Sequence, residues 1–165
     1  MKFCFCKPVA KTPADRHALL DAAVKSNGKF FMGTDSARKS SSCIPRPVPV
    51  SGVNHSDPVA HDISAKKGKG AAAAGVFTQP YACQYVLTAL EEAIERGDIK
   101  DEDVTEDMLK GFLSEWGRRF YGVESSQKKI VLKKGKEVIP ESVKAAGVEV
   151  VLFRKGETTW TVEWQ

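Results

Sequence analysis

Residues 29–37 have the sequence Lys-Phe-Phe-Met-Gly-Thr-Asp-Ser-Ala, a short apolar run that stops at a carboxylate between two hydroxyl-bearing residues. Such a run, with glycines on both sides, is typical of a strand buried on both faces, as in a parallel sheet. Ligands and catalytic groups lie at the carboxyl ends of such strands, because the connecting loops converge there. Asp35 is therefore the first candidate catalytic residue. The spacing is equally consistent with an Asp35 that only caps a turn between Thr34 and Ser36.

A strand and a helix are expected before this run. Residues 3–6 predict a strand, and residues 12–15 (Thr-Pro-Ala-Asp) are typical of a helix start, with a capping hydroxyl, a proline and an early carboxylate. The helix is expected to end at residues 26–28, where Asn and Gly tolerate a left-handed cap. With the strand over 30–35, this order predicts a βαβ unit over residues 1–37, which implies a parallel pair.

The composition then changes. Residues 38–60 hold half of the 8 prolines and show no period, so we expect a loop or a disordered insertion there. Residues 61–122 are predicted to form a loop and two helices, at 78–96 and 105–122. Residues 123–165 are predicted to form a β-rich tail. Its expected strands are 129–132, 137–139, 148–153 and 159–164.

Length and charge narrow the functional classes. The 165 residues are enough for one domain with a core but too few for a complete eight-stranded α/β barrel, which needs about 250. A net charge of +4 is far from the clustered basic footprint of a nucleic-acid binder. No apolar run approaches membrane-spanning length, and residues 1–6 are too short for a signal-peptide core. We therefore expect a cytoplasmic protein with neither nucleic acid nor membrane as partner.

Several of these stretches together resemble one enzyme family. They are FCKPVAK, FFMGTDSA, AAGVFTQPYA before a helix, EWGRRFYG at the end of the next helix, and the terminal TWTVEW. This combination resembles the C-terminal part of the homodimeric, single-function dihydroorotases. These are zinc amidohydrolases on a TIM barrel that interconvert N-carbamoyl-L-aspartate and L-dihydroorotate in pyrimidine (UMP) synthesis. The resemblance implies an α/β fold made of the last two strands and helices of a TIM (β/α)8 barrel, followed by a small β-rich tail.

The resemblance also implies roles for four residues. Asp35 matches the family's aspartate that binds one zinc ion and acts as general base on the metal-bound hydroxide, which is sensible chemistry for a carboxylate beside activated water. Lys7 matches a residue whose backbone contacts the pyrimidine ring. Ala74 matches a small residue that contacts the substrate, and His61 matches a histidine that grips the substrate carboxylate.

The remaining metal ligands of the family have no counterpart here. Its HxH pair, carboxylated lysine and two further histidines belong to strands one to six, which these residues do not match. The histidines present are His17, His55 and His61, and we expect His17 on a helix surface, far from any acid partner. A lone Asp35 cannot hold catalytic zinc, which takes three protein ligands. We therefore expect the chain to be inactive when it is alone. The resemblance also implies a homodimer. The alternative to an enzyme fragment is a non-catalytic interaction module on a partial barrel.

The motif around Asp35 is interrupted. In the family, Pro-His directly follows GTDSA, whereas here Arg38 and Lys39 follow. The codons of residues 38–40 can contain GTAAGT, a 5′ splice signal, and those of residues 59–60 can contain the AG of a 3′ splice site. Removing the sequence between these signals creates a proline codon and yields GTDSA-Pro-His61, so we expect residues 38–60 to be translated intron. The alternative is a genuine surface loop, since long insertions can be tolerated thermodynamically.

Overall fold

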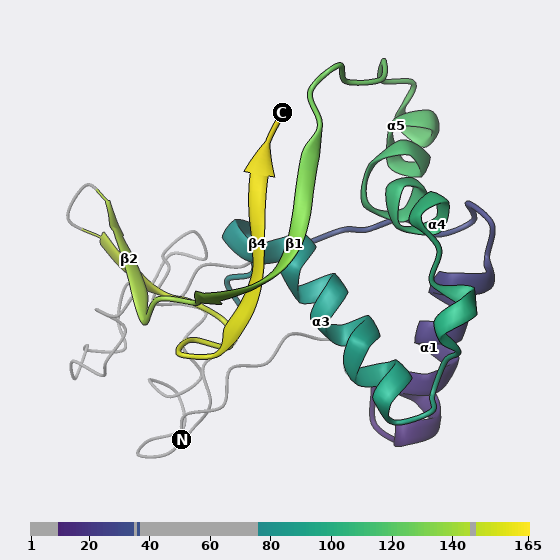
Figure 1. The fold of residues 1–165 in the computed structure, drawn as a ribbon, viewed down its shortest axis with the longest axis horizontal. Coiled ribbons are helices and arrows are strands. Elements are labelled where there is room, and N and C mark those ends of the chain that lie inside the picture. The colour runs from purple at the N-terminus through teal and green to yellow at the C-terminus, as the bar shows by residue number, and fades with distance from the viewer. Residues whose placement is uncertain (1–9, 35, 37–75, 146–147) are drawn as a thin grey trace, which may run out of the picture. The chain divides into compact units, whose positions relative to one another are not determined.

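The structure is a computed structural model that describes residues 10–34, 36, 76–145 and 148–165 (Figure 1). Its helical elements are α1 (Pro13–Lys25), η3 (Gln79–Tyr81), α3 (Ala82–Glu95), η4 (Asp101–Asp103), α4 (Glu106–Lys110), the π-helical η5 (Gly111–Glu115) and α5 (Trp116–Tyr121). Its strands are β1 (Ile130–Val138), β2 (Ser142–Ala145), β3 (Val148–Val151) and β4 (Thr158–Trp164). This mixture of helices and strands agrees with the predicted α/β class.

The chain divides into two compact units, which are described separately. The helical unit contains residues 10–34, 81–137 and 159–165. The hairpin unit contains Ser36, residues 76–80 and the described residues of 138–158. The predicted strand over residues 3–6 and the predicted insertion over residues 38–60 lie outside the described residues.

Helix α1 begins where the sequence predicts, because local side chains cap it. Thr12 Oγ1 accepts a hydrogen bond from the Asp15 N–H at 3.1 Å, and Asp15 Oδ2 accepts one from the Thr12 N–H at 2.9 Å. This reciprocal capping box satisfies two backbone donors that the first turn leaves without helical partners. The helix ends at Ser26, and Asn27 and Gly28 follow with positive φ angles of 47° and 94°.

The core of the helical unit joins α1 to the later helices. Its buried apolar residues are Val24, Leu90, Ala93, Ile99 and Met108. They come from α1, from α3, from the loop after α3 and from α4. The helix predicted from Thr78 to Arg96 is present as η3 and α3, and Gly97 follows it with φ 74°.

The helix predicted over residues 105–122 contains a π-helical turn. Thr105 Oγ1 caps α4 by accepting the Met108 N–H at 3.2 Å, and Gly122 ends α5 with φ 65°. Between them, the ring of Trp116 packs so closely on Gly111 that an added Cβ at position 111 would overlap the indole. The π turn therefore depends on a glycine where it begins.

The strand predicted over residues 30–35 is wrong for its described residues, 30–34. They form an extended segment that is assigned to no strand, and the Met32 N–H donates to the Phe112 carbonyl oxygen of η5 at 2.9 Å. A strand needs neighbouring strands to complete its hydrogen bonds. In the part of the chain that the structure describes, this segment lies against a helical turn instead.

All four described strands lie in the predicted β-rich tail. Strands β1 and β4 pair, and Lys129 and Gln165 exchange two backbone hydrogen bonds of 3.0 and 2.8 Å, which is the antiparallel pattern. Strand β1 joins two stretches that the sequence predicted as separate strands. In the hairpin unit, β2 and β3 pair antiparallel, from Ser142 opposite Val151 to Ala145 opposite Val148. Strand β2 was not predicted.

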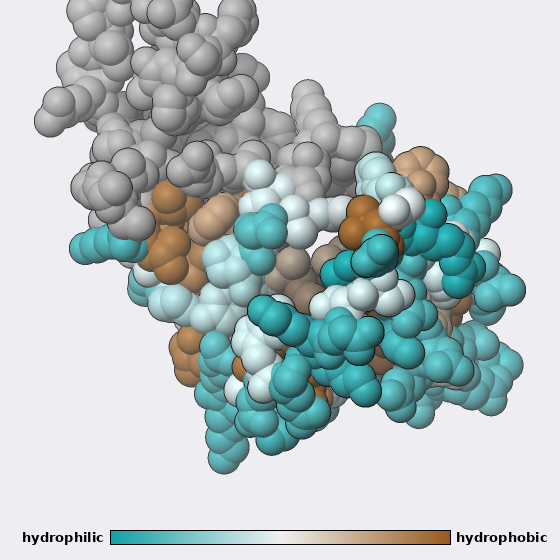
Figure 2. Space-filling view, turned by 90° about the horizontal axis from the view of Figure 1, so that it is seen from above, coloured by the Kyte–Doolittle hydropathy of each residue, from teal (hydrophilic) through white to brown (hydrophobic). Residues whose placement is uncertain are grey.

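The described surface seen in Figure 2 is mainly hydrophilic, and its hydrophobic residues form small separate groups. The large apolar side chains that remain exposed are Leu19, Phe30, Phe120, Tyr121, Val123, Val138, Val143, Phe153 and Trp164. Within the described ranges, no helix has both the length and the apolar character needed to cross a membrane.

Candidate functional site

The four site residues that the resemblance implies are Lys7, Asp35, His61 and Ala74, and all of them lie outside the described residues. Their roles therefore stay predictions. The described neighbours of two of them, Ser36 after Asp35 and the stretch from Val76 after Ala74, show how the chain beside the predicted site is held.

Ser36 is hydrogen-bonded to the start of η3. Its Oγ accepts hydrogen bonds from the backbone N–H groups of Thr78 and Gln79, each at 3.1 Å. The first N–H groups of a helical segment lack helical partners, and a serine hydroxyl is a preferred acceptor for them. The residue at the N-cap position of α3, Tyr81, makes no side-chain cap. Ser36 thus supplies, from a distant part of the sequence, an acceptor where η3 begins.

The stretch after Ala74 has a second anchor. The Phe153 N–H donates to the Phe77 carbonyl oxygen at 3.3 Å, and Leu152, next to Phe153, is almost fully buried. Ser36, residues 77–79 and Phe153, which are remote in the sequence, therefore contact one another within the hairpin unit.

Three polar contacts connect α3 and η3 to the strands of the helical unit. Glu91 accepts from Trp160 Nε1 at 2.9 Å and pairs with Lys134 Nζ at 2.7 Å. The hydrogen bond to Glu91 raises the pKa of Lys134. Tyr81 donates its hydroxyl to Glu137 at 3.3 Å, and partial burial, with the nearby Glu137 charge, raises the pKa of Tyr81. These contacts are structural, since each pairs a helix side chain with a strand side chain.

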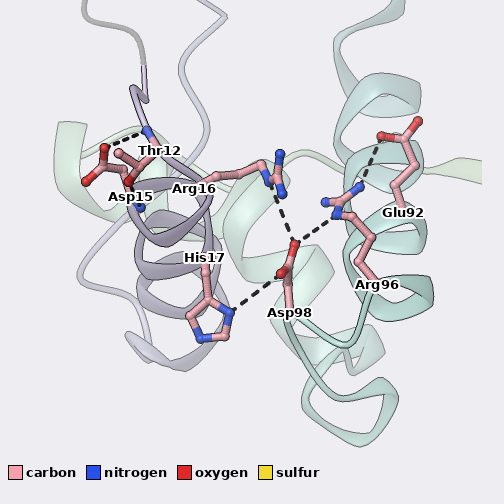
Figure 3. A network of polar contacts seen from close by, with 7 residues as sticks. All are labelled: Thr12, Asp15, Arg16, His17, Glu92, Arg96 and Asp98. Atoms are coloured by element: carbon pink, nitrogen blue, oxygen red, sulfur yellow. Dashed lines mark hydrogen bonds and ion pairs between the residues drawn. The ribbon is translucent and has the colours of Figure 1, made fainter.

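A charged network lies between α1 and the turn after α3 (Figure 3). Asp98 lies 2.9 Å from Arg96 Nε, 3.7 Å from Arg16 Nε and 3.8 Å from His17 Nδ1. The hydrogen bond from Arg96 holds the pKa of Asp98 below its ordinary value, and the charges of Arg96, Arg16 and His17 act in the same direction. The Asp98 N–H also donates to the Ala93 carbonyl oxygen at 2.8 Å. The network connects two helices through a charged carboxylate.

The position of His17 corrects one expectation. His17 is half-exposed, as expected of a surface residue, but the prediction that it lies far from any acid partner is wrong. The turn after α3 reverses the chain and brings Asp98 beside α1, although the two residues are distant in sequence. Nothing local to His17 indicates this partner.

The described residues do not supply a zinc site. Among residues 10–34, 36, 76–145 and 148–165, no group of three or more His, Cys, Asp or Glu side chains is placed to hold a metal ion. Cys83 is a free thiol whose pKa is raised by burial, which disfavours the thiolate form that binds metals. The described part of the chain therefore does not fit the metal that the resemblance implies.

The chain is similar to dihydroorotases along nearly its whole length. It is 36% identical over 166 residues to the probable dihydroorotase of Schizosaccharomyces pombe, which covers 99% of this chain and 39% of that protein. It is 31% identical to the dihydroorotase of Saccharomyces cerevisiae, over 98% of this chain and 37% of that protein. The crystal structure of the Saccharomyces cerevisiae dihydroorotase in complex with 5-fluoroorotic acid superposes with a TM-score of 0.66 at 30% identity. That superposition covers 98% of this chain and 37% of the solved chain.

These similarities confirm the resemblance predicted from the sequence. The chain spans less than two fifths of the length of the relatives it matches. No protein-family model matches it.

The sequence does not indicate that Ser36 caps a remote segment. Its hydroxyl directly follows the candidate acid Asp35, and hydroxyl residues are preferred acceptors at helix starts, but no local spacing relates it to Thr78 and Gln79.

Proposed function

We propose that these residues form the C-terminal part of a dihydroorotase, comprising the last two strands and helices of a TIM barrel and a β-rich tail. In the complete enzyme they would take part in interconverting N-carbamoyl-L-aspartate and L-dihydroorotate during pyrimidine biosynthesis. The observation that carries the proposal is the 36% identity over 99% of the chain, together with a match to only 39% of the relative. Cytoplasmic location and homodimerisation belong to the same proposal.

Asp35 is the proposed general base. Its carboxylate would accept the proton of the attacking water as the C–O bond forms at the ring carbonyl, and would return that proton to the amide nitrogen as the C–N bond breaks. The proposed binding residues are Lys7, His61 and Ala74. Ser36 supports the arrangement, because its contacts with Thr78 and Gln79 restrain the residue next to Asp35.

Zinc is the proposed cofactor of the complete enzyme only. Asp35 would supply one carboxylate ligand, and a catalytic zinc site takes about three protein ligands. The others would come from the part of a dihydroorotase that these 165 residues do not match. We therefore propose that the chain has no turnover when it is alone.

The first experiment measures dihydroorotate hydrolysis by the purified 165-residue chain with added zinc. We expect no rate above the uncatalysed background, and turnover by the chain alone would refute its proposed incompleteness. The non-catalytic alternative predicts instead specific binding to a full-length dihydroorotase or to an anionic ligand that Asp35→Asn leaves unchanged. The proposed enzyme role predicts that Asp35→Asn lowers dihydroorotate hydrolysis by a barrel assembled from this chain and the upstream part of a dihydroorotase.

A further inference from the structure

Three aromatic side chains of the helical unit form a cluster, which we call the aromatic patch: Phe31, Phe120 and Tyr121. The ring centroids lie 5.3 Å apart for Phe31 and Phe120, 5.8 Å for Phe31 and Tyr121, and 5.0 Å for Phe120 and Tyr121. Each ring therefore contacts the other two at ordinary aromatic distances. Phe120 is 71% exposed and Tyr121 is 70% exposed, so most of this apolar surface faces outward.

Backbone contacts hold the patch in place. The Met32 N–H donates to the Phe112 carbonyl oxygen, which fixes the extended segment against the helical run that ends in α5 (Figure 1). Gly117 lets the Phe31 ring approach, because an added Cβ there would lie 3.1 Å from Phe31 Cδ2. The rings are therefore arranged before any partner arrives, which lowers the ordering cost of an association.

The exposure of the patch indicates an interaction surface. Single exposed apolar residues are normal on protein surfaces, whereas contiguous exposed ones mark places where another surface docks. The neighbouring Phe30 and Val123 are also exposed, at 47% and 56%, and extend the apolar character of both segments. Aromatic side chains are also enriched among the residues that dominate binding energies.

We propose that the aromatic patch is covered by the part of a dihydroorotase barrel that these 165 residues do not contain. This inference rests on the proposed function. The similarity covers 98–99% of this chain but only 37–39% of each relative's length. Most of a relative's chain therefore has no counterpart here and could cover the patch. The patch includes Phe31, which lies in the extended segment that leads to Asp35. In the proposed complete barrel this segment would become a strand. Its neighbouring strands would come from the part of the barrel that these 165 residues do not match.

The test is co-expression of the 165-residue chain with a tagged upstream part of the Schizosaccharomyces pombe relative, followed by affinity purification. Phe120→Asp is the test variant. Trp164→Asp is the matched control, because Trp164 is an aromatic residue of the same unit that is 75% exposed but is no member of the patch. We expect Phe120→Asp to lower the amount of the 165-residue chain that co-purifies by at least about tenfold, and Trp164→Asp to change that amount by less than about twofold.

Hydroxyl-radical footprinting of the unmutated chain provides a second readout that needs no substitution. We expect oxidation of Phe120 and Tyr121 to fall when the upstream part is bound, while oxidation of Trp164 stays the same. Failure to co-purify, or equal effects of the two substitutions, would overturn the inference. So would a homodimer of the chain alone that Phe120→Asp dissociates, because a second copy would then cover the patch.

Failure of this inference can be separated from failure of the proposed function. Association that depends on Phe120, in a complex that shows no dihydroorotate hydrolysis even when one proline replaces residues 38–60, would support the docking surface and count against the catalytic role. Dihydroorotate hydrolysis by a complex that forms equally well with Phe120→Asp would support the catalytic role and overturn the docking surface.

Discussion

The Ser36 hydroxyl accepts hydrogen bonds from the backbone N–H groups of Thr78 and Gln79, which lie 42 and 43 positions further along the chain, where η3 begins. Because Ser36 directly follows Asp35, one hydroxyl connects the neighbour of the proposed catalytic residue to the start of η3. Asp98 connects residues in a similar way, since it lies in the turn after α3 and its carboxylate lies beside Arg16 and His17 of α1. At the scale of single residues, both the predicted site and the helical unit depend on polar groups that act over long sequence distances.

Replacing Ser36 with alanine should destabilise the fold by about 1–2 kcal/mol, because the Thr78 and Gln79 N–H groups lose this acceptor. Urea denaturation monitored by circular dichroism measures the change. Ser126→Ala is the matched control, since the Ser126 hydroxyl accepts an exposed hydrogen bond from the N–H of Lys128, only two residues away. Equal free energies of unfolding for the two variants would contradict the capping role of Ser36.

Replacing Asp98 with asparagine should destabilise the protein at neutral pH and matter less in acid. The pKa of Asp98 is below its ordinary value of 3.8 in the folded state, mainly because of the hydrogen bond from Arg96. Its contribution is therefore present above the unfolded-state pKa and is lost as the pH falls through the folded-state pKa. The difference in unfolding free energy between wild type and Asp98→Asn should shrink below pH 3.8.

The control for this experiment is Glu102→Gln, because Glu102 lies in a well-exposed pair with Lys100. Exposed pairs contribute little to stability. At neutral pH we expect Glu102→Gln to lower the free energy of unfolding less than Asp98→Asn does. A gap between wild type and Asp98→Asn that stays constant from neutral pH to strong acid would refute the network drawn in Figure 3.

At the scale of elements, Gly111 decides how the helical run from Glu106 to Tyr121 continues. Alanine normally stabilises a helix interior by about 1 kcal/mol relative to glycine. At Gly111 the added Cβ would overlap the Trp116 ring, so we expect Gly111→Ala to lower the free energy of unfolding by about 1–3 kcal/mol. Gly33→Ala is the control, because an added Cβ there meets nothing within 4 Å. Stabilisation by Gly111→Ala would contradict the packing of Trp116.

The elements that could be predicted are those with local signals. The helix start at residues 12–15 and the helix ends predicted near residues 96 and 122 depend on side chains within one or two turns, and the structure has them close to the predicted positions. The segment over residues 30–34 was mispredicted because an apolar run becomes a strand only when neighbouring strands pair with it. Strand β2 was missed for a related reason, since its four residues pair with β3 and their own pattern does not indicate that partner.

The candidate site was predictable only in part. Asp35 stands out from its position after an apolar run, whereas the roles of Lys7, His61 and Ala74 come from the resemblance alone. Ser36 with Thr78, and His17 with Asp98, are contacts between remote segments, which no local spacing indicates. Such contacts depend on how the chain folds back on itself.

At the scale of the whole molecule, residues 38–60 separate Asp35 from His61 and would let the proposed carboxylate-binding residue move away from the proposed base. We propose that these residues are translated intron. Sequencing the transcript should show a dominant message in which one proline codon replaces them. A dominant message that retains the whole segment would rule this out and favour a genuine surface loop.

The most direct test measures dihydroorotate hydrolysis by a complex of the upstream part of the Schizosaccharomyces pombe relative with this chain, in which one proline replaces residues 38–60. With zinc present, we predict turnover that Asp35→Asn lowers by at least about a hundredfold, as expected for loss of a general base. The same Asp35→Asn complex should still assemble, since the aromatic patch is unchanged. A complex without turnover, or one whose turnover is unaffected by Asp35→Asn, would contradict the account.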